Sequence, residues 1–206
     1  MKNLLILFIG VSLIACNDSG QGDIDLVNAF ADAPPGAERI PYPDKEGLVK
    51  VVKENDGRIM MEGDYLNGLR HGTWTEYHPT GMVKNIRGYF KGQMQGVYLS
   101  IDHRGNLLEK ATFGNGKKNG PYYKFERGRI VQEMSYVNDL VDGAVRRYYP
   151  NGGIQEQSYY SNGILHGTAQ WFDQEGNVTI QYKYENGKLV DKGEDKPAEE
   201  EDNSEE

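Results

Sequence analysis

Glycines recur along this chain in three series that keep the same interval. One series steps by 24, 24, 23 and 24 residues, and the other two keep this rhythm. The three series are Gly72, Gly96, Gly120, Gly143 and Gly167; Gly57, Gly81, Gly105, Gly128, Gly152 and Gly176; and Gly68, Gly92, Gly116, Asp139, Gly163 and Gly187, in which aspartate once replaces glycine. All three shorten by one residue together, and the deletion falls between Gly120 and Gly128. Three series that share one deletion indicate a tandem repeat.

Each repeat holds two short segments rich in aromatic and β-branched residues, separated by turns that contain glycine. In one unit, Trp74 lies in the first segment and Tyr89 in the second. Such segments between glycine-containing turns are typical of β-hairpins. Pairs such as Asn162-Gly163 favour the turns, because both residues tolerate positive φ. We therefore predict an all-β fold over residues 47–190, built from about six units of 23–24 residues. The tandem β-hairpins are expected to form an elongated, twisted antiparallel meander.

The pairing within this meander has two expected features. Trp74 and Tyr77 are three residues apart, which does not match the two-residue period of a strand. Either a bulge intervenes or both faces of the sheet are partly covered. Counting across the turn between units places Tyr89 near Tyr98 as a cross-strand aromatic pair, and the same pairing recurs in the next unit.

The composition favours a thin sheet over a thick core. Hydrophobic residues make up 37% of the chain, whereas globular domains usually have about 45–50%, and the 206 residues include 26 Gly and 14 Tyr. The net charge of −8 is concentrated at the C-terminus, where residues 191–206 hold nine acids and two lysines. The rest of the chain has no basic patch or stripe, so nothing indicates nucleic-acid binding.

The repeated unit, Gly-x-Trp/Tyr-x-x-Tyr/Phe followed by Asn-Gly-x-Ile/Val and Tyr-x-x-Gly-x-x-x-Gly, resembles the MORN repeat in its bacterial variant over about residues 47–190. The resemblance implies a β-hairpin array that serves as a scaffold for protein or lipid association and has no catalytic residues of its own. Proteins that resemble this chain are commonly described as antitoxin-like, and many carry lipoprotein signals.

The first residues are typical of an export signal. Lys2 precedes an apolar run from Leu4 to Leu13, which is too short to span a bilayer because a helical span needs about 20 residues. The segment Leu13–Cys16 resembles the lipobox of bacterial lipoproteins, which implies cleavage after residue 15 and acylation of Cys16. The alternative is an ordinary signal peptide whose cysteine merely lies near the cleavage site. Cys16 is the only cysteine, so no disulfide within the chain competes for it.

These features divide the chain into four parts. Residues 1–15 are the predicted lipoprotein signal peptide. Residues 16–46 are predicted to be a tether or irregular cover, because a cluster of prolines disfavours helices and central strands. Within this part, residues 26–33 could form one short helix. The repeat array follows, and residues 191–206 are predicted to be a disordered acidic tail. We expect an exported protein anchored to the bacterial cell envelope through acylated Cys16, with the outer membrane favoured and the leaflet left open.

No set of residues in the sequence indicates catalysis, a metal or a cofactor. His71 and His166 occupy the same position of the repeat, where other units have other polar residues, and no histidine pair has the spacing of metal ligands. Acids such as Glu109, Glu133 and Glu156 recur at the repeat interval and are interpreted as a solvated sheet face. We therefore expect a protein that is not an enzyme and that has no cofactor and no metal site.

Aromatic side chains form the candidate binding surface. Neighbours such as Tyr122 and Tyr123 point to opposite faces of a strand, so one ring of each pair is available to recognise protein or glycan. The candidates are Tyr98, Tyr122, Tyr123, Tyr148, Tyr149, Tyr159, Tyr160 and Trp171. The expected function is a membrane-anchored scaffold that binds another envelope protein. The alternatives are an antitoxin-like or immunity-like binding protein and a module that binds cell-wall polysaccharide.

Overall fold

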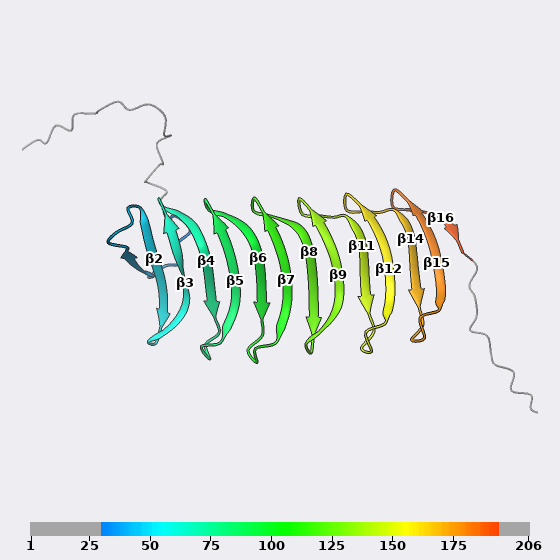
Figure 1. Ribbon diagram of the computed structural model, residues 1–206, viewed down its shortest axis with the longest axis horizontal. Helices are drawn as coiled ribbons and strands as arrows, with labels where there is room; N and C mark the ends of the chain where they lie inside the picture. The colour runs from blue at the N-terminus through cyan, green and yellow to red at the C-terminus, as the bar shows by residue number, and fades with distance from the viewer. Residues whose placement is uncertain (1–29, 194–206) are drawn as a thin grey trace, which may run out of the picture.

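The computed structural model describes residues 30–193, and in this range the chain forms one antiparallel sheet of 16 strands and no helix (Figure 1). The strands are β1 (Glu38–Pro41), β2 (Leu48–Asn55), β3 (Arg58–Leu66), β4 (Leu69–Tyr77), β5 (Val83–Phe90), β6 (Gln93–Ile101), β7 (Leu107–Gly114), β8 (Lys117–Glu126), β9 (Arg129–Val137), β10 (Leu140–Val141), β11 (Gly143–Tyr148), β12 (Ile154–Ser161), β13 (Ile164–Leu165), β14 (Gly167–Phe172), β15 (Val178–Glu185) and β16 (Lys188–Lys192). They stand side by side in a single layer that is longest across the strands (Figure 1). The predicted all-β antiparallel meander is confirmed.

The strand order follows the chain from β1 to β16, so each hairpin pairs with the next. Six hairpins make up the array, namely β2–β3, β4–β5, β6–β7, β8–β9, β11–β12 and β14–β15. In the last two, the first strand is divided, and the short strands β10 and β13 pair with β9 and β12. The division falls just before Gly143 and Gly167, whose φ angles are +95° and +104°.

The third glycine series forms two-residue turns along one edge of the sheet. Both residues of each turn have a positive φ, such as +51° and +77° at Asn67-Gly68. Positive φ at both central positions defines the type I′ turn, which matches the twist of the flanking strands. The turns are Asn67-Gly68, Lys91-Gly92, Asn115-Gly116, Asn138-Asp139, Asn162-Gly163 and Asn186-Gly187.

Backbone hydrogen bonds join these turns to one another. The N–H of the second turn residue donates to a carbonyl of the preceding unit, at 2.9 Å for Gly92 to Arg70 and at 2.8 Å for Gly187 to Leu165. The residue before a glycine of the first series adds a side-chain acceptor. Asp142 and His166 accept the N–H of the next turn at 3.0 and 3.4 Å. The polar residue at this position of the repeat therefore has a structural role, because it holds the neighbouring turn.

The second glycine series forms the hairpin tips along the opposite edge. The tip of β6–β7 is a longer loop in which Asp102 Oδ1 accepts the N–H groups of Arg104 and Asn106. The tip of β8–β9 is instead the two-residue turn Arg127-Gly128, with φ of +52° and +77°. The one-residue deletion in the repeat is therefore absorbed by a shorter tip, and the strands on both sides keep their pairing.

Every hairpin carries a β-bulge next to its tip. In β4–β5, Glu76 pairs with Asn85 and Tyr77 pairs with Val83, which leaves one extra residue in β5. The extra residues of the six hairpins are Met60, Lys84, Leu108, Val131, Gln155 and Thr179. The extra residue lies in β5, so Trp74 and Tyr77 of β4 project to opposite sides of the sheet. Of the two explanations for their spacing, the structure therefore contains the one in which both faces are partly covered.

The sheet begins earlier than the predicted array. Strand β1 pairs with β2, so part of the segment expected to be a tether belongs to the sheet. Pro41 is tolerated because β1 is an edge strand. The described part of the predicted helix, residues 30–33, forms turns because Pro34 disfavours a helical conformation at the residue before it. At the other end β16 reaches Lys192. Cys16, the signal peptide and residues 194–206 lie outside the described residues.

Candidate binding surfaces

Register pairs show which side chains share a face of the sheet, because residues directly opposite one another on neighbouring strands project to the same side. Trp74 pairs with Arg87, Arg87 with Tyr98, and this alternation continues to the end of the array. We call this side the aromatic face; its large residues are Tyr65, Trp74, Tyr89, Tyr98, Phe113, Tyr122, Tyr136, Tyr160, Trp171, Tyr182 and Tyr184. The other side is called the opposite face.

Rings on the aromatic face pack edge to face within one hairpin. Tyr98 and Phe113 have centroids 6.1 Å apart, and Tyr122 and Tyr136 are 5.7 Å apart at 74°. The contact expected across the turn between units occurs at the N-terminal end, where Tyr65 meets Trp74 at 5.2 Å. The later units instead pair their rings within the hairpin. Such pairs are worth about 0.5–1.5 kcal/mol beyond their buried area.

The N-terminal segment covers the first part of the aromatic face. Phe30 packs on the ring of Tyr65 at 4.9 Å, and its N–H donates to the Gly68 carbonyl at 3.0 Å. Under this cover Tyr65 is fully buried and Trp74 is 3% exposed. Together with Val51 they form the one cluster of buried apolar side chains in the described part of the chain.

A carboxylate in the cover meets a cation on the sheet. Asp32 Oδ1 accepts the Tyr65 hydroxyl at 2.8 Å, and Asp32 Oδ2 lies 2.6 Å from Arg70 Nε. The Arg70 guanidinium also stacks over the rings of Trp74 and Tyr89, at 4.6 and 5.3 Å from their centroids. Burial raises the pKa of Tyr65 to about 12. The cover is therefore held by one ring, one carboxylate and one cation.

One other unit repeats this cation. Lys118 lies two residues before Gly120, as Arg70 lies two residues before Gly72. Its ammonium is 5.1 Å from the ring centroid of Tyr122 and 5.0 Å from that of Tyr136. Sequence reasoning missed this position, although a basic residue at one repeat position in only two units was a readable signal.

The predicted binding residues do not form one surface. On the aromatic face lie Tyr98, Tyr122, Tyr160 and Trp171. On the opposite face lie Tyr123, Tyr148 and Tyr159. Tyr149 belongs to a hairpin tip, where its hydroxyl donates to the Phe172 carbonyl at 2.6 Å. Tyr149 therefore joins two units, as His78 does through the Ile101 carbonyl at 2.9 Å.

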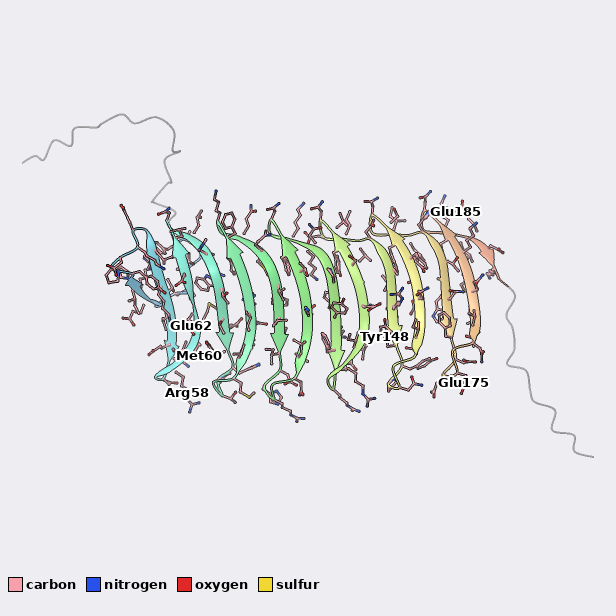
Figure 2. The ribbon with its side chains drawn as sticks, viewed as in Figure 1. Arg58, Met60, Glu62, Tyr148, Glu175 and Glu185 are labelled. Atoms are coloured by element: carbon pink, nitrogen blue, oxygen red, sulfur yellow. The ribbon has the colours of Figure 1, made fainter. Side chains whose placement is uncertain are left out.

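The opposite face also carries ion pairs and a contact between a tyrosine and a carboxylate. Arg146 and Glu133 are 2.6 Å apart, and the Tyr77 hydroxyl donates to Glu62 at 2.7 Å. Burial and a hydrogen bond with Glu133 raise the pKa of Tyr148 to about 12. Figure 2 shows Tyr148 between the tip edge, where Glu175 lies, and the turn edge, where Glu185 lies.

A cleft of about 620 Å³ separates the tips of β8–β9 and β11–β12. Its lining includes four cations, Lys124, Arg127, Arg129 and Arg147. Part of this charge is already engaged, since Arg147 pairs with Glu156 at 3.0 Å and Arg129 donates to the Pro150 carbonyl. Within residues 30–193 no three His, Cys, Asp or Glu side chains gather as a metal site, and none of the described residues forms a helix that could cross a membrane.

Comparisons with known proteins match part of the repeat array. The MORN repeat variant matches residues 70–91, 141–162 and 165–186. No curated protein matches the chain. Two solved structures match weakly. One is a S. aureus TarM mutant in complex with fondaparinux, alpha-GlcNAc-glycerol and UDP, with 14% identity and a TM-score of 0.34 over 46% of this chain and 19% of that one. The other is TarM, with 15% identity and a TM-score of 0.34 over 48% of this chain and 20% of that one. This chain thus spans about a fifth of their length. Three of the repeating hairpin segments are thus similar to the MORN repeat variant.

Proposed function

We propose that this chain is a membrane-anchored scaffold of the bacterial cell envelope, which binds another envelope protein through its aromatic face and catalyses no reaction. The observation that carries the proposal is the open row of rings beyond the N-terminal cover. Tyr98, Tyr122 and Tyr160 are only half-buried, because within residues 30–193 the sheet is a single layer. Tyrosine and tryptophan are enriched where proteins bind one another, since they bury a large area and still offer a polar group.

Binding can be tested by pull-down from an envelope extract with the purified array as bait. We expect one protein partner to be retained by the wild type and by Tyr123→Ala, and to be lost with Tyr122→Ala. The two tyrosines are adjacent but lie on opposite faces, so the pair is a matched comparison. Retention on glycan with no protein partner contradicts the proposal, and loss with Tyr123→Ala alone contradicts the choice of face.

The membrane anchor is proposed from the sequence around Cys16. Acylation adds about 0.8 kcal/mol per buried methylene, and two or more chains give stable attachment. Mass spectrometry of the mature protein is expected to find an acylated N-terminus at Cys16, and a Cys16→Ser variant is expected to leave the membrane fraction. A soluble wild-type protein that begins at another residue rules out the anchor.

A further inference from the structure

We infer that the fourth unit carries an open docking site of the kind that the N-terminal segment fills at the first two units, and that this site takes an extended acidic segment with an aromatic residue from a partner protein. The inference rests on the proposed function and specifies the chemistry of the partner. Its basis is that the chain itself shows how such a segment sits on the aromatic face.

The filled site defines what the segment must supply. Phe30 gives a ring that packs on Tyr65, and Asp32, two residues later, gives a carboxylate for Arg70 and the Tyr65 hydroxyl. Arg70 Nη2 also donates to the Asp32 carbonyl at 2.8 Å, so the cation holds both the backbone and the side chain of the segment. A ring followed by an acid is therefore the recognised pattern.

The open site has a similar construction by register, with Phe113 in the place of Tyr65 and therefore without the hydroxyl that binds Asp32. Lys118 pairs with Phe113 as Arg70 pairs with Tyr65. Tyr136 pairs with Gly120 as Tyr89 pairs with Gly72, and Tyr122 stands where Trp74 stands in its unit. The cation of each site lies over two rings, within 5.3 Å of both centroids. Tyr122 is half-exposed, whereas its counterpart Trp74 is covered; Tyr136 and its counterpart Tyr89 are both partly exposed.

Charge favours an acidic occupant at this unit alone. The position of Lys118 is occupied by Met94, Val141 and Leu165 in the third, fifth and sixth units. None of the ion pairs among residues 30–193 includes Lys118. Burial and the Glu109 carboxylate raise the pKa of Tyr122, and Glu109 repels a second carboxylate from that end. An incoming carboxylate is therefore directed to the Lys118 ammonium, while Asp139, which accepts the backbone N–H of Lys118 at 2.7 Å, is a second acid on this side of the site.

A synthetic peptide with the sequence Phe30–Glu38 is the probe, titrated into the purified array with its own cover intact. We expect one peptide to bind per chain, and Lys118→Ala to weaken binding at least about tenfold, because a hydrogen bond to a charged group is lost. Replacing the peptide's aspartate with asparagine is expected to weaken binding similarly. Lys110→Ala, on the opposite face of the neighbouring strand, is the matched control and is expected to bind normally.

The outcomes separate this inference from the proposed function. Peptide that fails to bind, or that binds Lys118→Ala as well as the wild type, overturns the inference. If Lys118→Ala fails to fold, Lys118→Met, which places the residue found at this position in the third unit, removes the charge and gives the same test. A dimer that Lys118→Ala dissociates assigns the site to a second copy of this chain and overturns the partner-protein assignment. An envelope protein still captured by the array in the absence of peptide binding leaves the proposed function standing.

Discussion

Arg127 holds a φ of +52° in the shortest kind of hairpin tip. A left-handed conformation costs most L-residues about 1–2 kcal/mol, whereas asparagine adopts it readily. We therefore expect Arg127→Asn to stabilise the array by about 0.5–1 kcal/mol and to raise the midpoint of thermal unfolding by a few degrees. Arg127→Ala removes the same side chain without this relief and is the control. Equal midpoints for the two variants would show that the backbone at this tip is not strained.

Glu76 is a carboxylate whose surroundings favour its charged form. Burial raises its pKa, but hydrogen bonds from Lys84 and Asn85 and the charges of Lys84 and Arg87 outweigh burial and hold the pKa below its usual value of 4.5. The unfolded chain therefore binds a proton more readily than the folded one. The stabilisation is present above about pH 4.5 and is lost as the pH falls through the folded-state pKa.

The prediction is that the thermal midpoint of the wild type falls more steeply between pH 6 and pH 3 than that of Glu76→Gln, since the variant has no carboxylate to protonate. Glu126→Gln is the matched control, because Glu126 is exposed and lies 3.9 Å from its nearest cation, Lys124. Parallel midpoint curves for Glu76→Gln and the wild type would contradict the role of Glu76.

Hairpins are joined at their tips as well as along their strands. The Tyr149 hydroxyl donates to the Phe172 carbonyl of the next hairpin, so Tyr149→Phe is expected to cost about 1 kcal/mol. The loss belongs to one interface, because the stability of a repeat array is a sum of units and neighbour contacts. Hydrogen exchange should therefore speed up in β14–β16 and stay unchanged in β2–β5. Tyr159→Phe, at an exposed ring on the opposite face, is expected to change neither region.

The hairpins themselves were readable from the glycine series, because positive φ at the turns leaves a direct signature in sequence. The bulges and the faces were not, since counting residues does not show where the register shifts. Glu109 and Glu133 look equivalent by spacing, yet their register partners Lys124 and Tyr123 lie on opposite faces. The shorter tip of β8–β9 causes this difference.

The docking geometry was beyond sequence reasoning for another reason. Asp32 and Arg70 are 38 residues apart, and no local pattern links them. The prolines of the N-terminal segment indicated a tether or irregular cover, and only the folded chain shows the segment seated on the sheet. The cation at the repeat position of Lys118 becomes meaningful once its filled counterpart is known.

The sheet of residues 30–193 has two unlike ends. At its N-terminal end a cover shields the aromatic face, and at its C-terminal end β16 is the edge strand of the described residues and exposes Leu189 and Val190. Charged residues such as Lys188 and Lys192 flank that edge, which discourages pairing with another chain. The array is thus capped at one end by packing and at the other by charge.

If the cover and the open site are equivalent, removing the cover should create a second site. We expect the double variant Phe30→Ala with Asp32→Ala to bind two peptides of the sequence Phe30–Glu38 instead of one, because Arg70, Tyr65 and Trp74 become available. In a Trp171→Phe background, the fluorescence of Trp74 should shift to longer wavelength in the double variant and return on titration. If the Trp74 fluorescence returns on titration in a Lys118→Ala background but not in an Arg70→Ala background, the second peptide lies at the vacated site. A stoichiometry that stays at one, with Trp74 still buried, would mean that the cover does not compete for the face.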